Sequence, residues 1–315
     1  MYASAPLHIP DGFLTLTVAL IGWALAALAI GFALRQTRHQ LGPRQIPLMG
    51  VLAAFIFAAQ AINFPVAGGT SGHLLGGALA AIILGPWAAV LILTSVIAVQ
   101  ALVFQDGGLL ALGFNIVNMG LLTAFTGHLV YGLTRRLAGE GRRSLLVAGA
   151  LGAWISVMAG AAATAIELAL SGATPLRVAL PAMLSVHALI GLGEAVITVG
   201  ALAFLFASRR DILALGSAAP AQASAAWTAV GLAIALGVAA LSPLASGDPD
   251  GLYRVAAQLG FEARALQPIV EVLSGYSVPL VGNATLSKII AVGLGTLIVF
   301  VLAWLVGRWQ RRATA

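Results

Sequence analysis

Nine apolar stretches run through the chain, and they restrict its possible folds more than any other feature. They cover 12–34, 47–64, 73–85, 87–104, 109–134, 145–170, 184–208, 225–244 and 286–306. A helix needs about 20 apolar residues to cross a bilayer, and fewer where protein surrounds it. Only 8% of the residues are charged, whereas soluble domains have about 25%. The sequence therefore predicts an all-α polytopic membrane protein and excludes an ordinary soluble enzyme, a disordered chain and a nucleic-acid-binding protein.

The third and fourth stretches form one apolar run that is broken at Gly85-Pro86. We interpret the break as a tight turn between two half-buried helices. A single kinked helix would reverse the topology downstream and place Arg135, Arg136, Arg209 and Arg210 on the outer side. With the N-terminus outside, the basic residues expected on the inner side are Arg35, Arg38, Arg44, Arg135, Arg136, Arg142, Arg143, Arg209, Arg210, Arg308, Arg311 and Arg312. The outer side keeps Arg177, Arg254, Arg264 and Lys288. Because Lys and Arg collect in cytoplasmic loops, this asymmetry predicts nine spans with the N-terminus outside and the C-terminus inside.

The chain divides into two parts at a stretch of small and polar residues. Residues 1–210 contain seven spans, and 211–224 are expected to form an inner linker. Residues 225–315 form a helix pair around a more polar outer segment, 245–285, with short helices expected at 250–260 and 263–274.

The sequence lacks the short motifs that mark nucleotide-phosphate binding and hydrolytic catalysis. It contains neither the phosphate-binding motif GxxxxGK[ST] nor the catalytic motifs GxSxG and HExxH. It also has no cysteine, which excludes disulfides and thiolate metal sites. We therefore expect the chain not to act as an enzyme, and we expect any ATP hydrolysis to depend on other proteins.

Two histidines are placed where they can meet outside the membrane. His8 precedes the first span, and His73 ends a loop rich in glycine, NFPVAGGTSGH at 63–73. Glycines let the backbone approach another group closely, so this loop can fold inward over a site. Two imidazoles suit Ni, Co, Cu or Zn better than Mg or Ca. The alternative is a pair of unconnected surface histidines.

Other polar residues lie within the spans or beside them. His187 and Glu194 are seven residues apart, so they share one face of a helix. A carboxylate in hydrocarbon is costly, and Glu194 should face the bundle in either a functional or a structural role. Glu167 is expected at the outer interface, and His128 is expected to be a hydrogen-bonded core histidine. His39 is expected to be solvated among the inner arginines.

Four stretches carry a resemblance to a known family. They are HIPDGFL at 8–14, AAFIFAAQAINFPVAGGTSGHLLGGALAAIILGPWAA at 53–89, QDGGLLALGFNIVNMG at 105–120 and HALIGLGEAVIT at 187–198. They resemble the CbiM/NikM family, the substrate-binding membrane subunits of cobalt and nickel energy-coupling-factor transporters. Residues 246–262 resemble the PDGLE segment of the small NikN-like companion subunit, with Tyr253 where the signature has Glu. The resemblance implies a seven-helix substrate-binding bundle with a two-helix C-terminal extension.

The resemblance also implies a metal site. Family members bind the metal through a free N-terminal amine, the backbone nitrogen and ring of the next histidine, and a second histidine before the third helix. The matching residues are Leu7, His8 and His73. Such a roughly square-planar nitrogen site suits Ni(II), with Cu(II) as a competitor.

Six residues precede Leu7 in this sequence, which departs from the family pattern. Our hypothesis is that the working chain begins at position 7, through an alternative start codon or through processing after Pro6. A chain that starts at Met1 cannot form the four-nitrogen site as the family builds it. Beside the ligands, Asp11 is expected either to hydrogen-bond a metal ligand or to cap a helix. Asn63 and Ser71 are expected to orient the loop.

The resemblance implies a subunit that captures Ni(II) or Co(II) as a transported substrate and has no resident cofactor. Its partners would be a coupling subunit of CbiQ/NikQ type and ATPases of CbiO/NikO type, in a bacterial cytoplasmic (inner) membrane. The fused outer segment favours nickel, because that fusion is frequent in the nickel branch. The first alternative is a proton-coupled secondary transporter that uses Glu167, Glu194 and His187. The second is a membrane metal sensor that transports nothing.

Overall fold

The computed structural model describes residues 7–38, 40–43, 45–139, 141–209, 225–267 and 272–312. Seven helical segments are long and apolar enough to cross a membrane, and they confirm the predicted all-α polytopic fold. They are α1 (Leu16–Thr37), α4 (Pro86–Val99) with a π-helical turn to Phe104, α5 (Leu112–Ile116) continuing through a π-helical stretch into α6 (Thr123–Ala138), α7 (Arg142–Leu170), α8 (Leu176–Ser208), α10 (Ala225–Ala240) and α12 (Ala284–Arg312). The predicted linker 211–224 and His39 lie outside the described residues.

The other two predicted spans are shorter helices, α2 (Gln45–Gln60) and α3 (Gly77–Leu84). At 1.5 Å per residue, α3 is only about 12 Å long and does not cross a bilayer by itself. The expectation of a helix over 73–85 is therefore corrected, because 73–76 belong to an irregular loop. The turn at Gly85-Pro86 is confirmed. Gly85 ends α3 with a φ of +85°, and Pro86 occupies the first turn of α4, where its missing N–H costs nothing.

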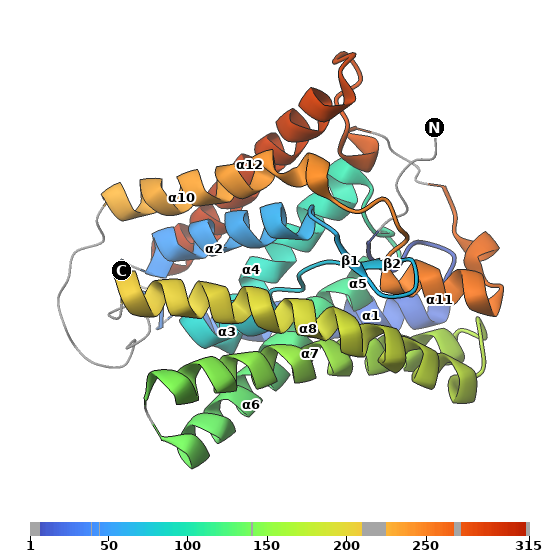
Figure 1. Cartoon of the computed structure of the whole chain (residues 1–315), viewed down its shortest axis with the longest axis horizontal. Helices are drawn as coiled ribbons and strands as arrows, with labels where there is room; N and C mark the ends of the chain where they lie inside the picture. The colour runs from blue at the N-terminus through green and yellow to red at the C-terminus, as the bar shows by residue number, and fades with distance from the viewer. Residues whose placement is uncertain are drawn as a thin grey trace.

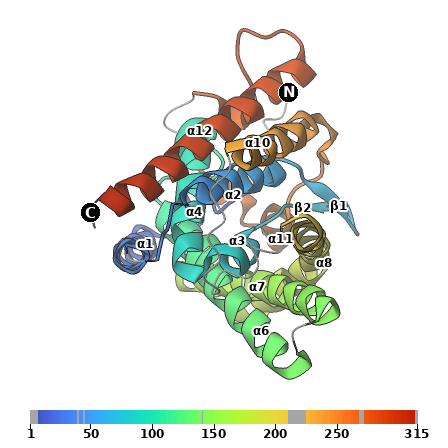
Figure 2. The same ribbon diagram turned by 90° about the vertical axis from the view of Figure 1, so that its left-hand side faces the viewer.

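The helices surround α3 and α4 in two groups. Helices α6, α7 and α8 pack side by side, and α2 packs with α10 and α12 on the other side (Figures 1 and 2). Helix α1 packs on α4 and α5. The C-terminal ends of α6, α8 and α12 and the N-terminal end of α7 lie at the left of Figure 1. Arg135 and Arg136 end α6, and Arg142 begins α7, so this end of the molecule is basic.

The loop before α3 forms a small β-hairpin at the opposite end of the molecule (Figure 1). Strands β1 (Phe64–Val66) and β2 (Thr70–Gly72) pair antiparallel, with Val66 opposite Thr70. Gly68 and Gly69 make the turn with positive φ. Strand β2 is buried, and Gly72 packs against the side chain of Ile190 in α8, where a larger residue would collide. The loop therefore folds inward, as its glycines predicted.

The C-terminal part confirms one of its two expected outer helices. Helix α11 (Gly251–Leu259) begins at the capping residue Asp250 and ends at Gly260. The expected helix over 263–274 is wrong, because the described residues there form only single helical turns at Glu262–Arg264 and Ser274–Tyr276. The N–H of Leu266 donates instead to the carbonyl oxygen of Asp11, at 2.8 Å. This contact draws the chain across the bundle and prevents a continuing helix.

Two glycines of α6 test the close packing that supports α3. A Cβ on Gly127 would collide with Ala78 of α3, whereas a Cβ on Gly132 would have nothing within 4 Å. We expect Gly127→Ala to lower the free energy of unfolding by about 1–3 kcal/mol, through overpacking. Gly132→Ala should be neutral or stabilising by up to about 1 kcal/mol, through helix propensity. Thermal unfolding of both variants in detergent checks this, and equal shifts would contradict the packing.

Candidate metal centre

The structure brings the two predicted histidines together. His8 lies in the segment before α1, and His73 directly follows β2. Their ring centroids are 5.5 Å apart with an interplanar angle of 87°, and the residues are 2% and 6% exposed. With metal–nitrogen bonds of about 2 Å, two imidazoles on one ion have centroids about 4–6 Å apart. The spacing therefore suits a single shared ion.

The ring nitrogens are in contact with carbonyl oxygens. His73 Nδ1 lies 3.0 Å from the oxygen of Leu74, and its Nε2 lies 3.1 Å from the oxygen of Leu7. A neutral imidazole has one N–H, so it can donate to only one of these two acceptors. His8 Nδ1 lies 2.9 Å from the carbonyl oxygen of Asp106, and His8 Nε2 is buried with no hydrogen-bond partner among the described residues. Each neutral ring keeps one nitrogen lone pair in this buried place, and imidazole nitrogen suits Ni, Cu and Zn.

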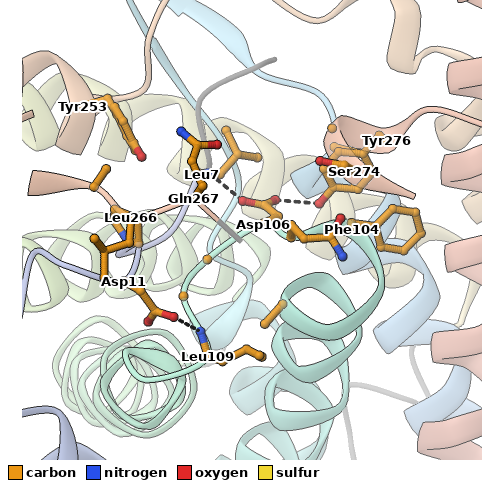
Figure 3. A pocket seen from close by; sticks show the side chains of 18 of the residues that line it. Leu7, Asp11, Phe104, Asp106, Leu109, Tyr253, Leu266, Gln267, Ser274 and Tyr276 are labelled. Carbon is orange, nitrogen blue, oxygen red and sulfur yellow. Dashed lines mark hydrogen bonds between the residues drawn. The ribbon is translucent and has the colours of Figure 1, made fainter. Parts of the chain in front are cut away.

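Leu7, the third predicted ligand, lies at the same place. Its N–H donates to Asp106 Oδ1 at 2.6 Å, and its carbonyl oxygen is the one beside His73. The Asp106 carboxylate is 3% exposed and also accepts a hydrogen bond of 2.6 Å from the Tyr276 hydroxyl. In Figure 3, Asp106 lies between Leu7 and Tyr276.

Asp106 was not predicted as a site residue. Helix α4 ends in the π-helical turn Gln100–Phe104, and Gln105 then adopts a left-handed φ of 54°. This reversal turns the next residue, Asp106, towards Leu7. The available signal was an acidic residue between two spans, in the QDGG stretch at 105–108.

The segment that carries His8 is held by backbone contacts. The Asn115 side chain accepts from the N–H of Ile9 and donates to its carbonyl oxygen, both at 3.1 Å. The N–H of Gly108 donates to the same oxygen at 2.9 Å. Gly107, with a φ of +105°, lies against the His8 side chain. Only glycine combines that conformation with so close an approach.

Asp11 was expected to hydrogen-bond a metal ligand or to cap the first helix, and in the structure it does neither. Helix α1 is preceded by Thr15, and the Asp11 carboxylate accepts from the N–H groups of Leu109, Leu110 and Ala111. It therefore supports the start of α5, as Figure 3 shows for Leu109. This contact fastens the N-terminal segment to the loop that contains Asp106.

Glu194 holds the loop that carries His73. Its carboxylate accepts from the N–H groups of Leu75, at 2.6 Å, and Gly76, at 2.9 Å. The structural interpretation of Glu194 is thus the one that the geometry favours, and its carboxylate is not paired with His187, whose Nδ1 instead contacts the Met183 oxygen at 2.8 Å.

Two other sequence expectations have clear outcomes. Glu167 was expected at the interface, but it is 4% exposed and accepts a hydrogen bond of 2.9 Å from Asn118. A carboxylate so close to the helix end is buried because Asn118 of the neighbouring π-helical stretch supplies a donor. His128 makes the expected hydrogen bond, with Nδ1 3.2 Å from the Ala81 oxygen of α3, but the expectation of a core histidine is wrong, because its side chain lies exposed on the face of α6.

Asn63 and Ser71 join the hairpin to the C-terminal part. The Asn63 amide donates to Ser71 Oγ, and that hydroxyl donates to the Asp248 carbonyl oxygen at 2.8 Å. The N–H of Ser71 donates to the Pro249 oxygen, and the N–H of Ser246 donates to the Asn63 oxygen. These residues orient the loop as expected, and they also hold residues 246–250 against it.

Two cavities lie close to the candidate ligands. An open cavity of about 560 Å³ reaches Leu7, Asp106 and Gln267 (Figure 3), and its lining also includes Glu262 and Lys288. A small cavity of about 70 Å³ is lined by Leu7 and by both histidines. Its polar lining residues are His8, His73, Asn115, Asn118, Thr164, His187 and Asp250. Within the described parts of the chain, no three side chains of His, Cys, Asp or Glu gather as a metal cluster.

Comparisons with known proteins show the family of the chain. Residues 8–212 match the family model of CbiM, the cobalt uptake substrate-specific transmembrane region, and 225–312 match the PDGLE domain. A putative fused nickel transport protein NikMN of Archaeoglobus fulgidus is 37% identical, covering 98% of this chain and 100% of that protein. The cobalt transport protein CbiM of Sorangium cellulosum is 38% identical, covering 66% and 94%. A crystal structure of a truncated transition metal transporter superposes with a TM-score of 0.58 at 34% identity, covering 64% and 98%.

The buried carboxyl of Asp250 should make the stability of the folded protein depend on pH. Burial raises the pKa of this carboxyl from 3.8 to about 8, although it accepts a hydrogen bond from the Tyr253 N–H. Between these pH values the unfolded chain releases the proton and the folded chain keeps it. Stability from this group is therefore present below about pH 4 and is lost as the pH rises towards 8, by up to about 1.4 kcal/mol per pH unit.

Asparagine at this position keeps the helix cap and does not titrate. We expect Asp250→Asn to gain stability relative to the wild type as the pH rises from 5 to 8, measured by thermal unfolding. Asp248→Asn, at an exposed position of the same segment, is the control. A parallel pH profile for Asp250→Asn and the wild type would contradict the prediction.

Proposed function

Because the chain belongs to the CbiM family of cobalt uptake substrate-specific transmembrane regions, we propose that it captures Ni(II) or Co(II) for an ATP-driven importer of the energy-coupling-factor type. The family and the relatives named above make it a membrane protein of cobalt or nickel transport. One observation carries the more specific proposal. The His8 and His73 rings meet next to Leu7, and all three residues line one small cavity.

The ligands in this proposal are the Leu7 nitrogen, the backbone nitrogen of His8 and the rings of His8 and His73. To chelate together with its own backbone nitrogen, the His8 ring must use Nδ1, because Nε2 lies on the far side of the ring. Nδ1 now contacts the Asp106 carbonyl oxygen, so loading exchanges that hydrogen bond for a metal bond. Four nitrogen donors in one plane suit Ni(II), with Cu(II) as a competitor, better than they suit Co(II).

The Asp106 contact supports an amine at Leu7. A primary amine that binds a metal through its lone pair still has N–H bonds, so it can keep donating to Asp106. An amide nitrogen loses its only hydrogen when it coordinates, and the carboxylate would then face a group with nothing to donate. We therefore propose that the metal-binding form begins at position 7. Because imidazole must be neutral to bind, affinity falls as the pH falls.

We propose that separate partners supply the energy. The chain lacks a phosphate-binding motif, so a coupling subunit of CbiQ/NikQ type and ATPases of CbiO/NikO type would drive transport. The basic end of the bundle would face the cytoplasm, with the histidines outside, in a bacterial inner membrane. Residues 1–210 would form the metal-binding unit, and 225–315 would form the NikN-like unit.

The contacts of the buried carboxylates weigh against a proton-coupled transporter. Both Glu194 oxygens accept backbone N–H groups, and Glu167 is hydrogen-bonded to Asn118. Each therefore supports structure, and nothing in these contacts forms a path between His187 and the carboxylates.

Uptake into vesicles tests the energy source. We expect radioactive nickel to enter only when the coupling subunit and ATPases are reconstituted with this chain and ATP is supplied. An ATPase variant that cannot hydrolyse ATP is the control. Uptake by the chain alone that stops when the proton gradient is dissipated would show a secondary transporter. Metal binding without uptake in the complete complex would indicate a sensor.

Alanine substitutions test the ligands. His8→Ala and His73→Ala should each lower Ni(II) affinity by at least about 100-fold, because each removes a nitrogen from the first coordination sphere. His128→Ala is the matched control and should bind as the wild type does, since that ring is bonded between α6 and α3. Isothermal titration with nickel chloride and thermal unfolding separate binding from folding. Equal losses in all three variants would mean that the ligands lie elsewhere.

A further inference from the structure

A hydrogen-bond chain connects the C-terminal part to the metal centre. The Tyr276 hydroxyl donates to Asp106 Oδ2, and Asp106 Oδ1 accepts from the Leu7 N–H, both at 2.6 Å. Figure 3 shows both bonds, with Asp106 between the other two residues. Tyr276 is 170 residues from Asp106 along the chain and belongs to the part that matches the PDGLE domain.

Tyr276 is held firmly in this position. Its ring stacks on Phe104, with centroids 4.7 Å apart and planes at 14°, and the Gln100 amide donates to its hydroxyl oxygen at 3.4 Å. Its backbone has a φ of +57°, which is unusual for a residue other than glycine. The N–H of Leu273 donates to the Val103 oxygen at 2.9 Å, so the segment before Tyr276 is fastened to the same turn. Surrounding contacts thus maintain a costly conformation that directs the hydroxyl at Asp106.

The hydroxyl determines which groups the Asp106 carboxylate can bind. With Oδ2 occupied by Tyr276, only Oδ1 is turned towards the N-terminal segment. Oδ1 is also 3.6 Å from His8 Nδ1, the ring nitrogen that must be freed to chelate a metal. If Tyr276 no longer restrained the carboxylate, it could rotate, bind the His8 ring and release the Leu7 nitrogen.

We propose that Tyr276 is a positioning residue of the metal centre and that it acts through Asp106 to align the Leu7 nitrogen with the His8 ring. The C-terminal part then contributes to metal binding, because its Tyr276 helps to set the position of a ligand nitrogen. The inference rests on the proposed function and adds a residue outside the metal-binding unit to it. The ligand chemistry is that of a divalent cation which favours four nitrogen donors in a plane, Ni(II) before Co(II).

The test uses the full protein in detergent with nickel chloride as the probe. Tyr276→Phe removes the hydroxyl and keeps the ring on Phe104. A hydrogen bond to a charged group is worth about tenfold or more in an equilibrium. We expect Ni(II) affinity to fall about tenfold by isothermal titration, and the visible absorption of planar Ni(II) to weaken per bound ion. Tyr131→Phe is the control. It removes a tyrosine hydroxyl from α6, outside this hydrogen-bond chain and outside both cavities, and should change neither readout.

A double-mutant cycle shows whether Tyr276 acts through Asp106. Asp106→Asn should weaken binding and the absorption in the same way, and Tyr276→Phe should add little in that background. A lower melting temperature with unchanged affinity and unchanged absorption would show a merely structural tyrosine and overturn the inference. If Tyr276→Phe is unstable, Asp106→Asn alone decides, and wild-type binding in that variant also overturns it.

The outcomes separate this inference from the proposed function. If the wild type binds nickel and His8→Ala does not, but Tyr276→Phe binds as the wild type does, only the role of Tyr276 fails. If the wild type binds neither Ni(II) nor Co(II), the proposed function fails and the inference fails with it.

Discussion

Every backbone N–H and C=O group buried away from water needs a partner, and this constraint determines how the site is built. The residues that bring His8 and His73 together are in irregular segments, which cannot satisfy themselves as a helix does. Polar side chains from helices and loops supply the partners. Glu194 accepts from the loop after His73, Asn115 pairs with Ile9, and Asp11 accepts from 109–111. These three side chains thus hold irregular backbone in place, and each neutral imidazole keeps one nitrogen lone pair for a ligand.

In this arrangement both parts of the chain hold the segments that carry the candidate ligands. The hairpin that leads to His73 is bonded to 246–250, and Asp106 is bonded to Tyr276. The N-terminal segment is bonded to Leu266. Residues 246–250, Leu266 and Tyr276 of the C-terminal part therefore all bond to segments beside the candidate ligands. In the proposed importer, movement of that part would change the metal site directly, without a long path through the bundle.

Much of the fold was predictable because it depends on local patterns. Apolar stretches located the helices, Gly85-Pro86 located the turn, and the glycines of 63–73 predicted the inward loop. The pairing of His8 with His73 was predicted from their chemistry and the family resemblance. Asp106 and Tyr276 were not, because their roles come from one contact across 170 residues, which the acidic residue of the QDGG stretch does not reveal by itself. The helix expected over 263–274 failed for a similar reason, since the bond from Leu266 to Asp11 outweighs helix propensity. The buried position of Glu167 depends in the same way on a donor, Asn118, from another helix.

The central claim is that one metal ion is held by the Leu7 nitrogen together with His8 and His73. A native mass spectrum of the protein purified from its own host tests it most directly, because it reports the N-terminal residue and the bound metal together. The account predicts a chain that begins at position 7 and carries one nickel or cobalt ion. A chain that begins at Met1 and still carries one such ion would contradict it, because the site would then form without a terminal amine at Leu7.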